Sequence, residues 1–160
     1  MQRLWLDPAN TPAFPPAISA VLSADLIIIG PGSLYTSLLP NLLVRDLAEA
    51  VRTSQALKFF ICNVATERGE TDHFNCLDHV RTVEKHVGEG LFDLVICNNH
   101  FEGDLGEGVE WVKMDMSMLQ HSAVYCSNLI DPQYSWRHDS KRLAKTVTDL
   151  FYERTGPLVE

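Results

Sequence analysis

Three segments of the chain, 25–29, 58–62 and 93–97, each begin with one charged residue, continue as an unbroken apolar run and stop abruptly at polar residues. Most of their side chains are β-branched or aromatic, and apolar positions do not alternate with polar ones. Continuous apolarity indicates burial on both faces, as in a parallel sheet that is covered by helices. We therefore predict three central parallel strands.

Between these strands the apolar positions recur every three or four residues, which predicts amphipathic helices. Helices are expected over 37–53, 75–87 and 140–153. Further short strands are predicted at 3–6, 109–112 and 123–126. This order predicts an α/β fold in which a doubly wound, mainly parallel sheet carries helices on both faces.

The polar segments that follow the three central strands are the candidate binding loops. They cover residues 30–37, 63–72 and 98–101. Ligands of doubly wound sheets bind beyond the carboxyl ends of the strands. We therefore expect the three loops to converge on one cleft.

Composition narrows the possible partners. The 160 residues, 46% of them hydrophobic, suffice for one domain with a real core. With 13 Lys+Arg against 21 Asp+Glu the net charge is −8, which argues against nucleic acid and anionic membranes as general partners. No apolar stretch approaches the roughly 20 residues of a membrane span, and residues 1–10 lack a signal-peptide pattern. We expect a cytoplasmic protein.

The cysteines and helical histidines predict no metal site. Cys62, Cys76, Cys97 and Cys126 are widely spaced, without a CxxC pair or a histidine at zinc-ligand spacing, and are expected to be buried free thiols. On the second predicted helix, His79 and His86 lack a suitably placed ligand partner. A solvated or capping role is expected for Asp78, His79 and His86.

The first loop, GPGSLYTS at 30–37, allows two interpretations. Its glycines permit close backbone approach, and free N–H groups at a helix start attract phosphate. A tight turn followed by a helix N-cap explains the same residues. The position at a central strand end favours binding.

The second and third loops are also ambiguous. Asn63 leaves a buried strand and can read a ligand or tie down the loop, while Thr71 or Asp72 can act as an N-cap. Asn98 and Asn99 suit a polar ligand, but they also suit an Asx turn. Position again favours binding.

One locally basic patch stands out in the acidic chain. Arg137 precedes the last predicted helix, whose first turns hold Lys141, Arg142 and Lys145. The guanidinium of Arg137 suits phosphate or carboxylate. Alternatively, Asp139 caps the helix and Arg137 pairs with a nearby acid. No catalytic arrangement is visible in the sequence.

Four ordered motifs closely resemble the CofD/YvcK family. The first is the segment 24–44 around GPGSLYTS, and the second combines 62–64 with GETD at 69–72 and DHV at 78–80. Segments 91–99 and 137–139 also match. The family includes 2-phospho-L-lactate transferases of deazaflavin coenzyme synthesis and the bacterial gluconeogenesis-factor proteins.

The resemblance implies a Rossmann-like fold and a nucleotide-type ligand: a UDP-sugar, GDP or a dinucleotide. The second motif looks more like the gluconeogenesis-factor branch, which is associated with UDP-sugar binding, carbon metabolism and cell shape. The alternative is a transferase of phosphorus-containing groups that acts on a deazaflavin, and only this alternative calls for Mg²⁺. The expected ligand-binding residues are Gly30, Gly32, Ser33, Leu34, Tyr35, Thr36, Asn63, Thr66, Glu70, Thr71, Asn98, Asn99 and Arg137.

The family's Gly-Gly-Gly-Thr-Gly loop and Asp-rich metal segments are absent from the chain. Residues 1–160 are therefore expected to form a single α/β domain like the C-terminal half of the family fold, without the N-terminal glycine-rich half. Such a partial sheet should expose an apolar edge, and we expect a homodimer.

Overall fold

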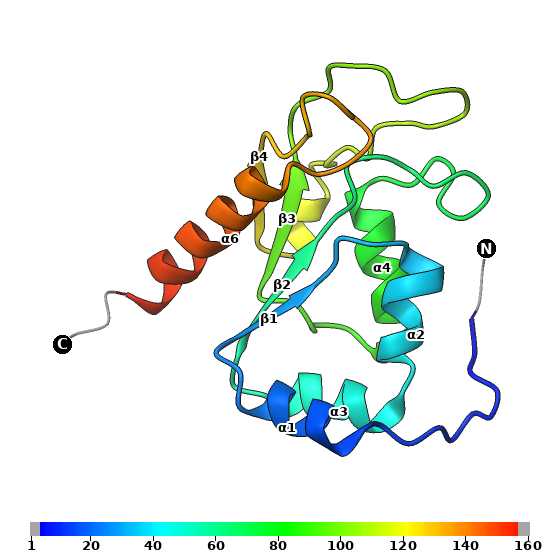
Figure 1. The fold of residues 1–160 in the computed structure, drawn as a ribbon, viewed down its shortest axis with the longest axis vertical. Coiled ribbons are helices and arrows are strands. Elements are labelled where there is room, and N and C mark those ends of the chain that lie inside the picture. Colours follow the sequence, from blue (N-terminus) through cyan, green and yellow to red (C-terminus); the bar gives the residue numbers. More distant parts are fainter. Residues whose placement is uncertain (1–3, 157–160) are drawn as a thin grey trace.

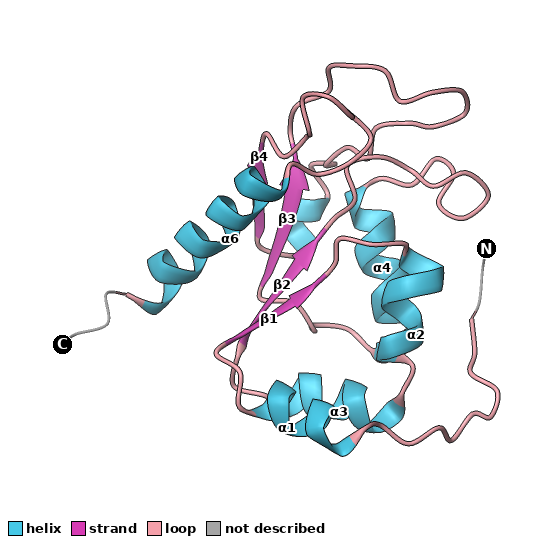
Figure 2. Ribbon diagram, viewed as in Figure 1, coloured by secondary structure: helices cyan, strands magenta, loops and turns pink. Residues whose placement is uncertain are grey.

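Four parallel strands form the centre of the fold (Figures 1 and 2). The computed structural model of the chain describes residues 4–156. The strands lie in the order of the sequence: β1 (Leu26–Ile29), β2 (Leu57–Ile61), β3 (Leu94–Asn98) and β4 (Val124–Ser127). The predicted parallel sheet and α/β class are confirmed, because each strand pairs in parallel with the next.

Helices cover both faces of the sheet, as predicted. The helical segments are α1 (Pro15–Leu22), the π-helix η1 (Leu34–Leu38), α2 (Leu39–Leu42), α3 (Arg45–Thr53), α4 (Cys76–Val87), α5 (Met118–His121) and α6 (Ser140–Thr155). α6 lies on one face, and α2 and α4 lie on the other (Figure 1). No helix within residues 4–156 is long and apolar enough to cross a membrane.

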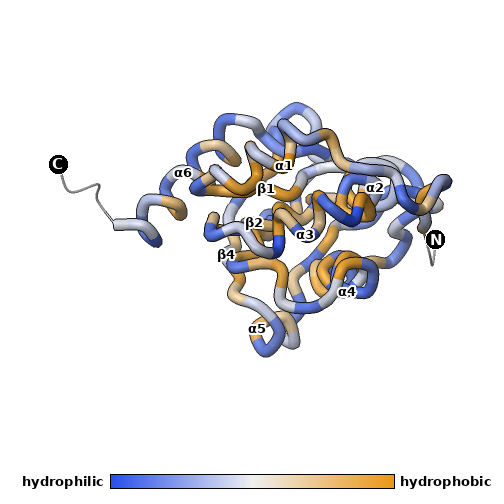
Figure 3. Tube along the Cα trace, turned by 90° about the horizontal axis from the view of Figure 1, so that it is seen from below, coloured by the Kyte–Doolittle hydropathy of each residue, from blue (hydrophilic) through white to orange (hydrophobic). Residues whose placement is uncertain are grey.

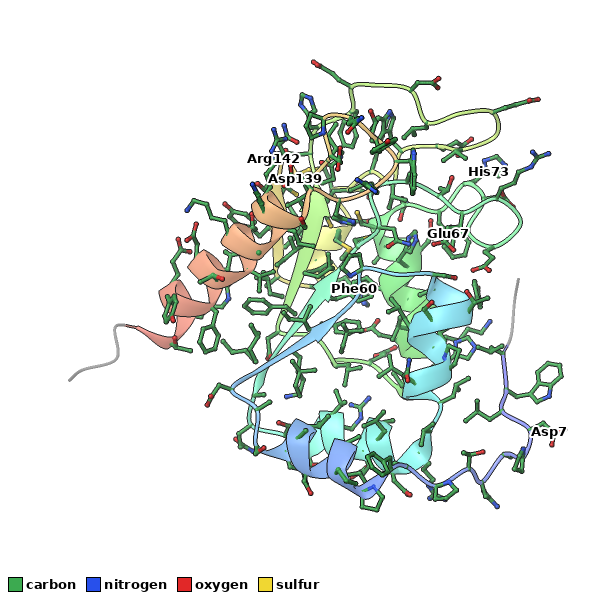
Figure 4. All side chains as sticks on the ribbon, in the orientation of Figure 1. Asp7, Phe60, Glu67, His73, Asp139 and Arg142 are labelled. Atoms are coloured by element: carbon green, nitrogen blue, oxygen red, sulfur yellow. The ribbon has the colours of Figure 1, made fainter. Side chains whose placement is uncertain are left out.

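The core is divided by the sheet into two clusters. Phe60 packs with Leu34 and Val80 on the α4 side, whereas Phe59 packs with Val147 on the α6 side. Neighbouring residues of β2 thus point into opposite clusters, so the strand is buried on both faces. Apolar residues gather on the strands and on α2 and α4 (Figure 3), and Phe60 lies between the sheet and α4 (Figure 4).

Three predicted elements differ in the structure. The helix expected over 37–53 is divided: η1 passes directly into α2, which holds Pro40 in its first turn, and the break lies at Val44, which is extended before α3 begins. The strand expected at 109–112 forms only one bridge, between Ala65 and Trp111. Of the strand expected at 3–6, residues 4–6 are not extended in any sheet and Arg3 lies outside the described residues.

Helix α4 begins later than expected. Asn75 and Asp78 form a reciprocal capping box, so neither Thr71 nor Asp72 is the N-cap. Asp78 thus has the expected capping role. The expected solvated role of His79 is wrong, since this side chain is only 1% exposed. The expected cap of α6 is confirmed, because Asp139 accepts hydrogen bonds from the first-turn amides.

Candidate functional site

A pocket of about 760 Å³ lies at the carboxyl ends of β1 and β2. The loops that follow these strands form one wall, and two later segments form the other. The lining residues are Pro31, Gly32, Asn63, Val64, Ala65, Thr66, Glu67, Arg68, Leu105, Val109, Trp136, Arg137 and His138. Glu67 lies above the start of α4, and Asp139 lies across the strand ends at the start of α6 (Figure 4). Four of the expected ligand-binding residues line this pocket: Gly32, Asn63, Thr66 and Arg137.

The side chain of Asn63 holds the first two loops together. Its Oδ1 accepts from the Gly32 amide at 3.2 Å, and its Nδ2 donates to the Gly32 carbonyl at 3.1 Å. Gly30, just before this contact, has φ +96°, and a Cβ there would lie 2.6 Å from the Ile61 carbonyl oxygen. The close approach of the two loops therefore requires glycine at position 30.

The hydroxyl groups of the first loop bond within the site. Ser33 donates to Glu70 Oε2 at 2.7 Å and accepts from the Thr36 hydroxyl at 2.6 Å and the Thr36 amide at 3.3 Å. Leu34 and Tyr35 are buried in the core, and burial raises the pKa of the Tyr35 hydroxyl. A ligand at these two positions would therefore meet the backbone rather than the side chains.

The second loop is fixed by buried threonines. Thr66 exchanges two hydrogen bonds with Glu110, one through its amide at 2.8 Å and one through Oγ1 at 2.9 Å. Thr71 Oγ1 accepts from the Glu67 amide at 2.8 Å. Burial, helped by the nearby Glu70 carboxylate, raises the pKa of Glu67. The second loop thus presents the partly buried carboxyl group of Glu67 to the pocket, and hydrogen bonds of Thr66 and Thr71 already fix the backbone of this loop.

The two adjacent asparagines after β3 have different environments. Asn98 is 1% exposed; its Oδ1 accepts from the Leu129 amide at 3.1 Å and its Nδ2 donates to the His100 carbonyl. Asn99 is exposed. Asn98 therefore connects β3 to the segment after β4. No residue of the loop at 98–101 lines the pocket, so only two of the three expected loops meet there.

Arg137 both pairs with an acid and lines the pocket. Its Nε and Nη2 donate to Asp131 Oδ2 at 3.2 and 3.1 Å, and its guanidinium lies 4.5 Å from the centre of the Tyr134 ring. The side chain is half-exposed, as is the neighbouring Trp136. The interpretation that Arg137 pairs with a nearby acid is therefore correct, and the residue also lines the pocket.

His138 lies deeper in the same wall. Its Nε2 donates to the Cys62 carbonyl at 3.2 Å, and burial lowers its pKa to about 4. His138, Trp136 and Arg68 were not among the expected ligand-binding residues, because nothing in the sequence brings their segments to the ends of β1 and β2. The sequence indicated these residues only by position: Arg68 lies in the second loop, and Trp136 and His138 are the neighbours of Arg137.

The depressed pKa of His138 predicts an acid-sensitive stability. Between pH 6.5 and about 4 the unfolded chain takes up a proton at this residue and the folded chain does not. The free energy of unfolding should therefore fall as the pH decreases through this window, by up to about 3 kcal/mol. Urea unfolding at pH 7.5, 5.5 and 4.5 should show a shallower fall for His138→Gln. Parallel profiles for the two proteins would contradict this assignment.

Comparison with protein families identifies the chain. The family described as "2-phospho-L-lactate transferase CofD" matches residues 1–130. The chain belongs to the CofD family. Among curated relatives, a gluconeogenesis factor from Listeria innocua is 38% identical over 154 residues, which cover 92% of this chain and 48% of the relative. A gluconeogenesis factor from Bacillus subtilis is 35% identical over 167 residues, which cover 96% of this chain and 51% of the relative.

Solved structures support the CofD-family fold. Two crystal structures of a Bacillus halodurans protein match with TM-scores of 0.85 and 0.86, at 34% and 33% identity. Each match covers 92% of this chain and 50% of the other protein. The chain thus spans about half the length of the curated relatives and solved structures that it matches, and the resemblance to the CofD family is confirmed.

Proposed function

We propose that this CofD-family chain forms one wall of a binding site for a nucleotide-type ligand, with a UDP-sugar as the leading class. On this proposal it acts as a cytoplasmic regulatory protein of the gluconeogenesis-factor type, linked to carbon metabolism and cell shape. The observation that carries the proposal is the pocket at the ends of β1 and β2, where Gly32 backbone and the Arg137 guanidinium line one space.

The chemistry of the pocket suits a phosphate joined to a flat ring. Arg137 and Arg68 bring two cations into a chain of net charge −8. A guanidinium binds phosphate oxygens through two parallel hydrogen bonds. Trp136, 55% exposed, offers an aromatic face on which a base can stack.

Calorimetric titration tests this proposal. Folded protein is titrated with a UDP-sugar, GDP and a dinucleotide in separate runs. We expect saturable heat with one of them, and inorganic phosphate should compete weakly. The absence of heat with all three, in protein whose circular dichroism shows a folded α/β domain, would remove the proposal.

Replacing Arg137 by glutamine should weaken ligand binding by about 10- to 100-fold, because a charge-assisted bidentate contact is lost. Lys145→Gln is the matched control: it removes one positive charge, but Lys145 pairs with Asp149 at 2.6 Å on α6 and does not line the pocket. Both variants are compared by titration with the ligand found above. Equal loss in the two variants would show that only net charge matters.

A second candidate is transfer of a phosphorus-containing group, as the description of the matched family suggests. The observation in its favour is the Ser33, Glu67 and Glu70 group, an all-oxygen set of the kind that Mg²⁺ prefers. These residues would hold the ion, which would neutralise charge on a transferred phosphate. Mg²⁺-dependent product formation from a deazaflavin acceptor would support transfer, and its absence in a version that spans the full relatives would exclude it.

The expected homodimer is also a proposal. β1 is an edge strand of the described sheet, and its Ile28 is 48% exposed. An apolar side chain on an open edge favours pairing with another chain or segment. A second copy, or the further length present in the relatives, would cover this edge, and sedimentation analysis of the chain would distinguish dimer from monomer.

A further inference from the structure

The cysteines form a row across the sheet that the sequence spacing conceals. Cys97 of β3 is the direct partner of Cys126 of β4, and Ile61 is the partner of Ile96. The next pair along these strands is Cys62 and Cys97, and the Cys62 amide donates to the Ile96 carbonyl at 3.0 Å. Partnered residues of parallel strands point to the same face. This face is the one covered by α4 (Figure 1).

A fourth cysteine approaches this row from the covering helix. Cys76 is the first residue of α4, and it shares a core cluster with Cys62 and Cys97. The Sγ atoms of these three residues all lie within 4.8 Å of one another, and all three residues are 0% exposed. Thiolates on a zinc ion, with bonds of about 2.3 Å, lie about 4 Å apart. The three sulfurs need to contract by less than about 1 Å to reach that geometry.

The start of α4 adds a favourable field at this point. Cys76 is the first residue of the helix, and the amides of a first helical turn carry positive potential that stabilises a thiolate. A cation bound among the three sulfurs would displace the thiol protons.

His79 supplies a second, independent indication. Its Nδ1 lies 2.9 Å from the Asn75 carbonyl oxygen, which can only accept, so Nδ1 carries the proton and Nε2 has a free lone pair. Nε2 is buried and has no hydrogen-bond partner among residues 4–156. A ring fixed through Nδ1 to a backbone carbonyl is the usual arrangement of metal-binding histidines. His79 lies about one helical turn after Cys76, on the same side of α4. Its ring nitrogens are not among the ligand atoms that lie within 4.8 Å of one another, so the ring must turn for Nε2 to reach an ion held by the three sulfurs.

We propose that Cys62, Cys76 and Cys97 form a buried site for one soft, thiophilic metal ion, and that the His79 ring turns to bring Nε2 to the ion as the fourth ligand. The ion class is Zn²⁺ or Cu⁺, since thiolate and imidazole suit these metals and exclude Mg²⁺ and Ca²⁺. Binding releases the thiol protons to solvent and changes no oxidation state. The site is separate from the pocket and does not depend on the proposed ligand.

The test is titration of reduced, metal-free protein with Co²⁺ as a spectroscopic substitute for Zn²⁺. We expect a sulfur-to-cobalt charge-transfer band that saturates at one equivalent and disappears on addition of Zn²⁺. An anaerobic arm with Cu⁺ and a chromogenic chelator distinguishes the two metals. The absence of the band, together with no retention of either metal after gel filtration, would overturn the proposal.

Variants locate the ion. Cys97→Ala should weaken binding by at least about 100-fold, whereas Val95→Ala, a larger truncation on the same strand and in the same core cluster, should leave it unchanged. His79→Gln should weaken binding by about 10- to 100-fold, and unchanged affinity would overturn its role as a ligand.

If Cys97→Ala does not fold, the melting temperature of the wild-type protein decides the question: it should rise with Zn²⁺ and not with Mg²⁺. Equal response to both ions would contradict a thiolate site.

Discussion

Replacing Gly30 by alanine is expected to lower the free energy of unfolding by about 3 kcal/mol or more. The φ of +96° alone costs a residue with a Cβ about 1–2 kcal/mol. The added Cβ would also stand 2.6 Å from the Ile61 carbonyl oxygen, so backbone rather than a flexible side chain must move. Because Ile61 ends β2, the movement would separate the two loops that form the pocket, and ligand binding should be lost with stability. Urea unfolding and calorimetric titration measure the two effects.

The matched control is Gly69→Ala, in the second loop. Gly69 has φ +80°, but a Cβ there would have no neighbour within 4 Å. Only the conformational strain remains, so we expect a loss of about 1–2 kcal/mol. If the two variants lost equal stability, the close approach at Gly30 would carry no energetic weight.

Replacing Asn98 by alanine should cost about 3 kcal/mol, whereas Asn99→Ala should change stability by less than about 0.5 kcal/mol. In the first variant the Leu129 amide is left buried without its acceptor, and the side-chain bond to the His100 carbonyl is lost as well. In the second variant an exposed side chain is removed. Thermal and urea unfolding of the two variants give the comparison.

Ligand titration of Asn98→Ala and Asn99→Ala measures affinity, independently of stability. Asn99→Ala should leave both affinity and stability nearly unchanged, because its exposed side chain does not line the pocket. Asn98→Ala, measured at a temperature where it stays folded, should affect affinity only through the position of its loop. Equal loss of stability in both variants would contradict the division of roles.

The strands could be predicted from the sequence because burial on both faces makes their central positions apolar. Residues 59–62 and 94–97 are apolar for this reason, and the ends of β1 and β2 located the pocket. The division of the first long helix could not be predicted in detail, since the apolar period continues through Leu43 and Val44 where the backbone turns. The helix propensities of these residues do not indicate the turn, because tertiary packing overrides them here.

The candidate site was predictable in position and not in detail. Asn98 and Asn99 are the same residue type in adjacent positions, so the sequence does not show which of them is buried. The contact of the Leu129 amide with Asn98 shows it in the structure. The cysteines are far apart in the chain, and strand register together with the start of α4 brings three of them together. Burial of His79 depends on Phe74, whose ring meets it edge-on at 5.5 Å, a contact that no helical period reveals.

The double hydrogen bond between Asn63 and Gly32 has a kinetic consequence. Because this bond holds the first and second loops in register before any ligand arrives, an encounter need not wait for a slow rearrangement. For the proposed nucleotide-type ligands, association should then differ little from one ligand to another, while residence time varies widely. Selectivity among related metabolites would therefore reside in how long each complex lasts rather than in how fast it forms.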